Sequence, residues 1–216
     1  MLWRRALADG LGTALLLAVV VGSGITGERL AQGNSAIALL ANALATGLGL
    51  FALIVAFAAR SGAHFNPVVT ASLAVRRQFP VGAVAPYIVA QFAGAALGVL
   101  IAHAMFDLPL YQISEKARMS TGQLLSEAVA TCGLVFVIFS CEREKPWVTA
   151  AVVGAYIAAA YWFTASTSFA NPAVTLARSL TATFAGIDPA HVVPFMLAQI
   201  IGAAAALGAE RLLRHS

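Results

Sequence analysis

The sequence predicts an all-α membrane protein, in which six transmembrane helices accompany two re-entrant half-helices in an inverted repeat. Three observations lead to this prediction. The 216 residues are 60% hydrophobic and only 10% charged, whereas a soluble domain is about 25% charged. Six apolar stretches are long enough to cross a hydrocarbon core of roughly 30 Å. Two Asn-Pro dipeptides, at Asn66 and Asn171, each open an apolar segment too short to cross it.

The six predicted spans follow one another along the whole chain. Arg4 and Arg5 precede the first span, a pattern that is also typical of a signal peptide. Its apolar stretch is longer than a signal core, however, and no A-x-A-like cleavage site leads into a soluble domain. We therefore expect a transmembrane helix here. Because this stretch is slightly short, the helix could begin nearer Ala6. The ranges are roughly Gly10–Thr26, Ala36–Ala59, Val81–Phe106, Leu124–Cys141, Val148–Ala165 and Val192–Leu213.

The basic residues predict the orientation of the chain in the membrane. With six spans and a cytoplasmic N-terminus, nine lysines and arginines fall on the cytoplasmic side and four on the other, as the positive-inside rule requires. The net charge of +4 therefore requires no nucleic-acid partner. Cys132 and Cys141 are the two cysteines, and we interpret them as free apolar fillers.

The two Asn-Pro sites are predicted to begin half-helices. Asparagine is a favoured N-cap, and proline is favoured at the first helical position. The segment from Asn66 to Arg77 has 12 residues, and at 1.5 Å per residue it is about 18 Å long, roughly half a bilayer. In many soluble proteins an Asn-Pro pair marks only a loop-to-helix junction. Two copies at matching places in a membrane protein favour a pore, because irregular backbone at membrane depth lines a cavity.

The halves of the chain match each other beyond these dipeptides. Each half consists of two spans, a half-helix and a third span. Three spans are an odd number, so the second half is inverted relative to the first, as in known transport architectures. We predict one channel domain, residues 1–216, with repeats of about 1–106 and 119–216. The matched motifs are Asp9-x3-Thr13 with Glu127-x3-Thr131, and Gln91-x2-Gly94-Ala95 with Gln199-x2-Gly202-Ala203.

Inversion brings the N-termini of the two half-helices together near the membrane centre. Their positive dipole ends form a barrier to cations, including protons. The Asn66 and Asn171 amides supply N–H donors for the oxygen of a small molecule. A water molecule held by both would point its own hydrogens outward, which would interrupt a proton wire. This mechanism is a hypothesis that proton-flux measurements on aspartate variants can test.

These residues resemble the signatures of the aquaporin, or major intrinsic protein, family. The segment from Ser61 to Thr70 is similar to the family's first signature, SGxHxNPAVT, and the second signature appears at Asn171. The resemblance covers the whole chain. It implies an aquaporin-like right-handed bundle, a homotetramer with one pore per subunit, and a pore midpoint formed by Asn66, Pro67, Val68, Asn171, Pro172 and Ala173. Val68 departs from the usual alanine.

The resemblance also assigns roles to buried polar residues. It implies that Asp9 and Glu127 brace the re-entrant loops by accepting backbone hydrogen bonds. For Asp9, an ordinary interfacial position remains the alternative. His64 is interpreted as a loop-structuring residue near the pore, and no metal or other cofactor is predicted.

Counting without gaps from the signatures, the resemblance places the selectivity filter at Thr46, Ala159, Ser168 and Val174. Val174 stands where water and glycerol channels usually carry arginine. A filter without arginine, histidine or aromatic residues implies a wider, less polar constriction. A register shift of two or three residues in the fifth span would instead place one of its aromatic residues, Tyr156, Tyr161, Trp162 or Phe163, in the pore.

Arg178 lies four residues after Val174, one helical turn outward. We predict that it lines the outer vestibule and partly restores the cation barrier. The alternative is an interfacial arginine that snorkels from a helix end.

The predicted function is passive permeation of small uncharged solutes and water. Glycerol-like polyols are the expected class, together with arsenious acid, because the second signature resembles bacterial channels linked to arsenic resistance. A water-selective aquaporin is the nearest alternative, and an ion- or proton-coupled secondary transporter is another. An enzyme is not expected, because the sequence shows no set of a nucleophile and a base and no cluster of metal ligands. The expected location is a membrane, with both termini cytoplasmic and the bacterial inner membrane as the site.

Overall fold

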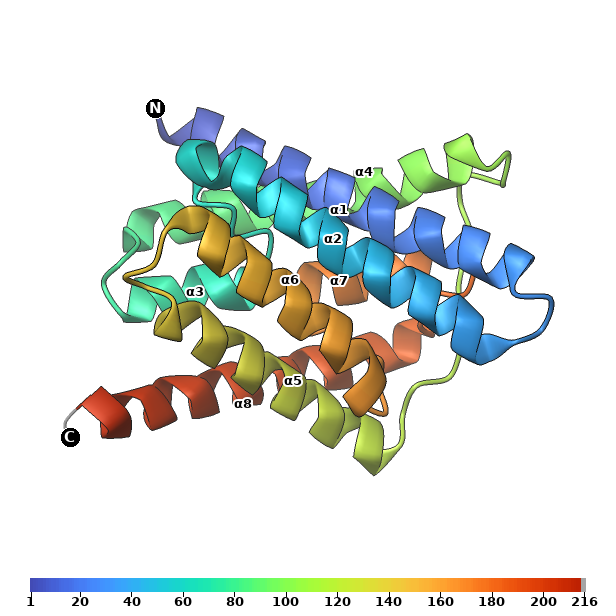
Figure 1. Cartoon of the computed structure of the whole chain (residues 1–216). Coiled ribbons are helices and arrows are strands. Elements are labelled where there is room, and N and C mark those ends of the chain that lie inside the picture. Colours follow the sequence, from blue (N-terminus) through green and yellow to red (C-terminus); the bar gives the residue numbers. More distant parts are fainter. Residues whose placement is uncertain (215–216) are drawn as a thin grey trace.

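A computed structural model of the chain describes residues 1–214, and these residues form helices and connecting loops without β-strands. Six helices are long and apolar enough to cross a membrane, and two short helices lie between them (Figure 1). This confirms the predicted helix count. The long helices are α1 (Leu2–Leu30), α2 (Ser35–Ser61), α4 (Val84–Met105), α5 (Thr121–Ser140), α6 (Pro146–Phe163) and α8 (Pro189–Arg214); the short ones are α3 (Pro67–Val75) and α7 (Pro172–Ala177).

Two helix boundaries differ from the sequence-based expectation. Helix α1 begins at Leu2 and ends at Leu30, so it includes charged residues at both ends that hydropathy alone excluded. Helix α3 has nine residues and ends at Val75. Arg77 adopts a left-handed backbone with φ of 60°, which is incompatible with a continuing α-helix. The first half-helix is therefore shorter than predicted.

Glycines bring pairs of long helices into close contact. A Cβ atom on Gly94 of α4 would overlap the Gly10 carbonyl oxygen of α1, and one on Gly202 of α8 would overlap the Ala128 carbonyl oxygen of α5. These positions tolerate only hydrogen as a side chain. Small residues let transmembrane helices approach closely and gain van der Waals contact. The Gly-Ala motifs that match between the two halves therefore lie where α1 contacts α4 and where α5 contacts α8.

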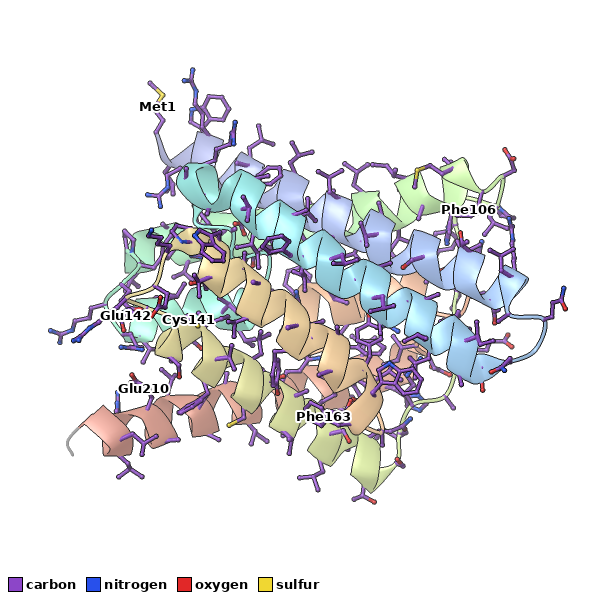
Figure 2. All side chains as sticks on the ribbon, in the orientation of Figure 1. Met1, Phe106, Cys141, Glu142, Phe163 and Glu210 are labelled. Atoms are coloured by element: carbon purple, nitrogen blue, oxygen red, sulfur yellow. The ribbon has the colours of Figure 1, made fainter. Side chains whose placement is uncertain are left out.

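The N-terminus and the C-terminal end of α8 lie at one end of the bundle, which we call the terminal end (Figure 1). Figure 2 places Met1, Glu142 and Glu210 there, whereas Phe106 and Phe163 lie at the opposite, distal end. Arg76, just after α3, bonds Glu142 at 2.8 Å and Glu210 at 3.3 Å. These ion pairs tie the C-terminal end of α3 to the α5–α6 loop and to α8.

Candidate functional site

The N-terminal ends of α3 and α7 meet inside the bundle. Asn66 caps α3, with its Oδ1 accepting from Val68 N at 3.1 Å. Asn171 caps α7, with its Oδ1 accepting from Ala173 N at 3.0 Å. Pro67 and Pro172 occupy the first helical positions, where a missing N–H has no cost. The two short helices α3 and α7 thus begin in the same way, with an Asn N-cap followed by a proline.

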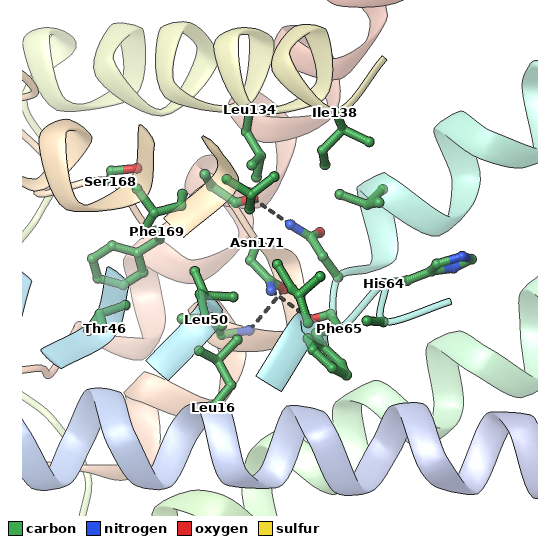
Figure 3. Close-up of a pocket in the computed structure, with 18 of the residues that line it drawn as sticks. Leu16, Thr46, Leu50, His64, Phe65, Leu134, Ile138, Ser168, Phe169 and Asn171 are labelled. Carbon is green, nitrogen blue, oxygen red and sulfur yellow. Dashed lines mark hydrogen bonds between the residues drawn. The ribbon is translucent and has the colours of Figure 1, made fainter. Parts of the chain in front are cut away.

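Each Asn amide also reaches across to the other half of the chain. Asn66 Nδ2 donates to Ala170 O, and Asn171 Nδ2 donates to Phe65 O, both at 2.8 Å. Figure 3 draws these bonds inside the cavity. One N–H of each amide is therefore used to join the two loops. Because each amide has two N–H groups, the second remains for a molecule in the cavity.

The loops that lead into α3 and α7 have matching backbone conformations. Ala63 and Phe65 have φ of 52° and 51°, and Ser168 and Ala170 have φ of 47° and 48°. Non-glycine residues in the left-handed region cost roughly 1–3 kcal/mol each, and they persist only where their surroundings hold them. The loops therefore need strong partners.

Asp9 supplies these partners in the first half. The carboxylate is fully buried; it accepts from His64 N at 2.9 Å and from Phe65 N at 3.0 Å. Gln91 Nε2 donates to it at 2.7 Å, and Ser61 Oγ at 2.8 Å. The alternative that Asp9 is an interfacial residue is therefore wrong, because the early start of α1 carries this position into the bundle.

Glu127 occupies the equivalent place in the second half. It is fully buried and accepts from Phe169 N and Ala170 N, both at 2.9 Å. Gln199 Nε2 donates to the same carboxylate at 2.6 Å. Each carboxylate thus accepts hydrogen bonds from the backbone N–H groups of the two residues that directly precede an Asn.

His64 lies at the terminal side of the cavity (Figure 3). Its Nδ1 is 3.1 Å from Thr70 Oγ1, and its ring packs against Phe79 and Tyr87 with centroid distances of 4.8 and 5.2 Å. The imidazole therefore contacts the first turn of α3 and lines the cavity.

One elongated cavity passes both Asn residues. Its empty volume is about 850 Å³, which includes space that is open to solvent. His64 lies at one end, and Thr46, Ser168 and Phe169 lie at the other (Figure 3). Its wall is mainly aliphatic, with Leu16 and Val20 from α1, Leu50 and Ile54 from α2, Leu134 and Ile138 from α5, and Val153 and Ile157 from α6.

Three of the four predicted filter residues line this cavity, and one does not. Thr46, Ser168 and Val174 are buried and contribute to its wall. Ala159 is exposed on the outer surface of α6, so its assignment to the filter is wrong. The α6 residues that line the cavity are Thr149, Val153, Ile157 and Tyr161, which repeat every four residues along one helix face. Ala159 falls between two of these positions and points away.

The corrected register brings an aromatic ring to the distal end of the cavity. Tyr161 is 3% exposed, and its hydroxyl lies 3.3 Å from Thr46 Oγ1. The expectation of a filter without aromatic residues is therefore wrong at this position. The four-residue period of α6 was the signal in the sequence; counting without gaps missed it because the loop before Asn171 does not preserve the helical phase.

Arg178 also lies in the wall of the cavity, and the residue is 2% exposed. Its guanidinium carbon is 3.4 Å from the centroid of the Phe169 ring. This burial is incompatible with an arginine that snorkels from a helix end to the interface. A second arginine, Arg118, lies 5.1 Å from the same ring centroid. No local pattern predicts that the two arginines share this ring, because they are 60 residues apart.

We expect Tyr161→Ala to widen the distal constriction. Removal of the ring leaves Thr46 without its hydroxyl neighbour and adds space beside Ser168. The permeability of vesicles to a four-carbon polyol such as erythritol should rise several-fold relative to glycerol, as measured by stopped-flow light scattering. Tyr161→Phe keeps the ring and serves as the control. An unchanged erythritol-to-glycerol ratio in Tyr161→Ala would contradict the placement of this ring in the solute path.

Comparison with known proteins gives consistent matches. Residues 1–165 match the family described as "Major intrinsic protein". The chain is 49% identical to aquaglyceroporin AqpS of Rhizobium meliloti (strain 1021), covering 98% of this chain and 91% of that protein. It is 30% identical to the propanediol uptake facilitator PduF of Salmonella typhimurium, covering 67% of this chain and 54% of that protein.

A solved structure has the same fold. The X-ray structure of the aquaglyceroporin from Plasmodium falciparum superposes with a TM-score of 0.77, at 20% sequence identity, covering 96% of this chain and 95% of that chain. The six long helices and two half-helices therefore form an aquaporin-type bundle, as predicted from the sequence.

Proposed function

The chain belongs to the major intrinsic protein family, and from this premise we propose that it is a passive transmembrane channel for small uncharged solutes, glycerol-like polyols above all, and for water. The single observation that supports this most directly is the cavity that passes both Asn residues. Its wall is mainly aliphatic, and polar groups occur at a few points. Such a path offers hydrogen bonds to hydroxyl groups and apolar contact to the carbon backbone of a polyol. The names of the related proteins point to the same class of solute.

The test is stopped-flow light scattering on vesicles that contain the purified protein. We expect glycerol and water permeabilities well above those of protein-free vesicles, a linear dependence on the glycerol gradient, and no dependence on a proton or sodium gradient. Saturable, gradient-driven uptake would instead favour a secondary transporter. A high water permeability without glycerol permeability would favour a water-selective aquaporin.

Arsenious acid is a second solute that we propose. It is uncharged near neutral pH and carries three hydroxyl groups, so its hydrogen bonding is similar to that of glycerol. The same vesicles, assayed for arsenic uptake, test this separately from glycerol.

We propose roles for the residues along the path. Asn66 and Asn171, with Pro67, Pro172, Val68 and Ala173, form the midpoint, where the free amide N–H groups orient a solute oxygen. Asp9, Glu127 and His64 hold the two loops in place. Thr46, Ser168, Val174 and Tyr161 form the distal constriction, and Arg178 lies at its outer edge.

Asn171→Asp tests the midpoint. The substitution keeps the oxygen that caps α7 but replaces the N–H donor by a negative charge, which reduces the barrier created by the two helix N-termini. We expect proton flux to rise at least several-fold, measured with a pH-sensitive dye inside vesicles under an imposed pH gradient. Asn34→Asp, at the exposed cap of α2, is the matched control. Proton flux no higher than wild type would rule out the proposed barrier.

We further propose a homotetramer in the bacterial inner membrane, with one pore per subunit and both termini in the cytoplasm. Nine basic residues at the terminal end, against four at the distal end, support this orientation. The whole chain, residues 1–216, forms one channel domain from two inverted repeats.

A further inference from the structure

A buried cation at the distal end of the cavity has unused hydrogen-bond donors. Arg178 Nε donates to Ala185 O, and one face of the guanidinium packs on Phe169. These contacts fix its plane. Nη1 is buried without any hydrogen-bond partner. A guanidinium has five N–H donors, and the two on Nη1 of Arg178 remain unused beside the cavity wall.

This cation has no carboxylate partner among residues 1–214. The ion pairs of this part of the chain involve Arg76 and lie at the terminal end. Arg118, the other arginine near Phe169, donates to the carbonyl oxygens of Gly186 and Ser166, both at 3.0 Å. Buried charges are normally paired with an opposite charge. The nearest buried carboxylate, Glu127, accepts from Phe169 N and Ala170 N and acts electrostatically on both guanidinium groups. It offsets one of the two positive charges, so one net positive charge remains near the distal end of the cavity.

Lys116 in the loop before α5 adds to this positive charge. Burial and the neighbouring guanidinium groups of Arg118 and Arg178 lower the pKa of Lys116, while Glu28 acts in the opposite direction. Its Nζ donates to Phe184 O at 2.8 Å. The ammonium group thus lies within the electrostatic reach of both arginines, and the distal mouth attracts anions.

A second unpartnered donor lines the same end of the cavity. Ser168 is 2% exposed, and its Oγ has no hydrogen-bond partner. The residue is held in place by its left-handed backbone and by the bond from its N–H to Ser166 Oγ at 3.2 Å. Tyr161 lines this cavity as well, and its hydroxyl lies 3.3 Å from Thr46 Oγ1. A fixed cation and two hydroxyl groups form a polar site in a wall that is otherwise apolar.

We propose that the distal end of the cavity is a binding site for a small hydroxycarboxylate, with the carboxylate on Arg178 and the hydroxyl group on Ser168. Planar guanidinium groups match carboxylates in geometry, and charge-assisted hydrogen bonds are about twice as strong as neutral ones. The site lies in the path described under the proposed function. The aliphatic wall beyond it does not solvate a charge, so the bound anion stays at the mouth and blocks neutral solutes.

The test uses sodium lactate at pH 7.5 and the purified full-length protein. We expect external lactate to reduce the glycerol permeability of vesicles by at least threefold, with saturation, relative to sodium chloride of the same ionic strength. In Arg178→Gln, lactate should no longer reduce glycerol permeability. In Ser168→Ala, the half-inhibiting concentration should rise several-fold. Arg29→Gln, an exposed arginine at the same end of the bundle, removes the same formal charge and should behave like wild type.

Lactate binding to the detergent-solubilised protein, measured by titration calorimetry, separates this proposal from the channel function. Binding to wild type that weakens about tenfold or more in Arg178→Gln supports the site even if glycerol permeation is absent. If Arg178→Gln does not fold, Arg178→Lys and Ser168→Ala give the same comparison. The proposal is overturned by the absence of lactate binding to wild type, or by binding that is equal in the Arg178 and Ser168 variants.

Discussion

Glu127→Ala is expected to destabilise the second half of the bundle strongly. The carboxylate accepts hydrogen bonds from Phe169 N, Ala170 N and Gln199 Nε2, and alanine leaves all three donors unpaired. A buried unpaired donor costs about 1–3 kcal/mol. No water is available in a bilayer core to replace the lost acceptor. In detergent, the melting temperature should fall by about 10 °C or more, and glycerol permeability should be lost.

The control for this prediction is Glu115→Ala. Glu115 is exposed in the loop between α4 and α5, so its loss should leave the melting temperature within a degree or two. Glu127→Gln keeps the size of the side chain and one acceptor oxygen, and we expect an intermediate loss. A Glu127→Ala variant with wild-type melting temperature and permeability would show that Glu127 does not hold the Phe169–Ala170 backbone.

The hydropathy pattern was sufficient to predict the six long helices, because burial in lipid requires about 20 consecutive apolar residues and leaves a clear signal. The two Asn-Pro dipeptides located the half-helices for a similar reason, since capping is a local property of the sequence. Helix ends were less predictable. Leu2 starts α1 because a helix continues into the interface, where hydropathy falls but backbone hydrogen bonding still favours helix.

The distal constriction was the hardest part to predict. Val174 was placed in the cavity wall by counting from the second signature, because it lies on α7, the helix that Asn171 caps. Thr46 also lines the cavity, although a loop with left-handed residues separates α2 from Asn66. Ala159 was misplaced, since an irregular loop separates α6 from Asn171 and the count across it fixes no rotation of the helix. The burial of Arg178 beside Phe169 depends on contacts with Ala185, which no local pattern indicates.

Val174→Arg should reduce glycerol permeability about tenfold or more. Val174 is 5% exposed and lines the cavity in the first turn of α7. Arginine has a much longer side chain, which would occupy the constriction opposite Tyr161. It would also add a further cation one helical turn from Arg178, and each of these two guanidinium groups raises the cost of burying the other. Stopped-flow measurements should show a smaller loss of water permeability, because water passes a narrower opening than glycerol does.

Two control variants show whether the effect of Val174→Arg comes from added volume alone or depends on the charge and on the position in the cavity. Val174→Leu adds one methylene at the same site and should retain most of the glycerol permeability. Ala159→Leu adds volume on the outer surface of α6, where the side chain does not reach the cavity, and should match wild type. If Ala159→Leu reduced glycerol permeability and Val174→Arg did not, α6 would have to be rotated so that Ala159 faced the solute. The Thr46–Tyr161 contact would then be wrong, so this pair of variants tests the register of α6 as well as the width of the constriction.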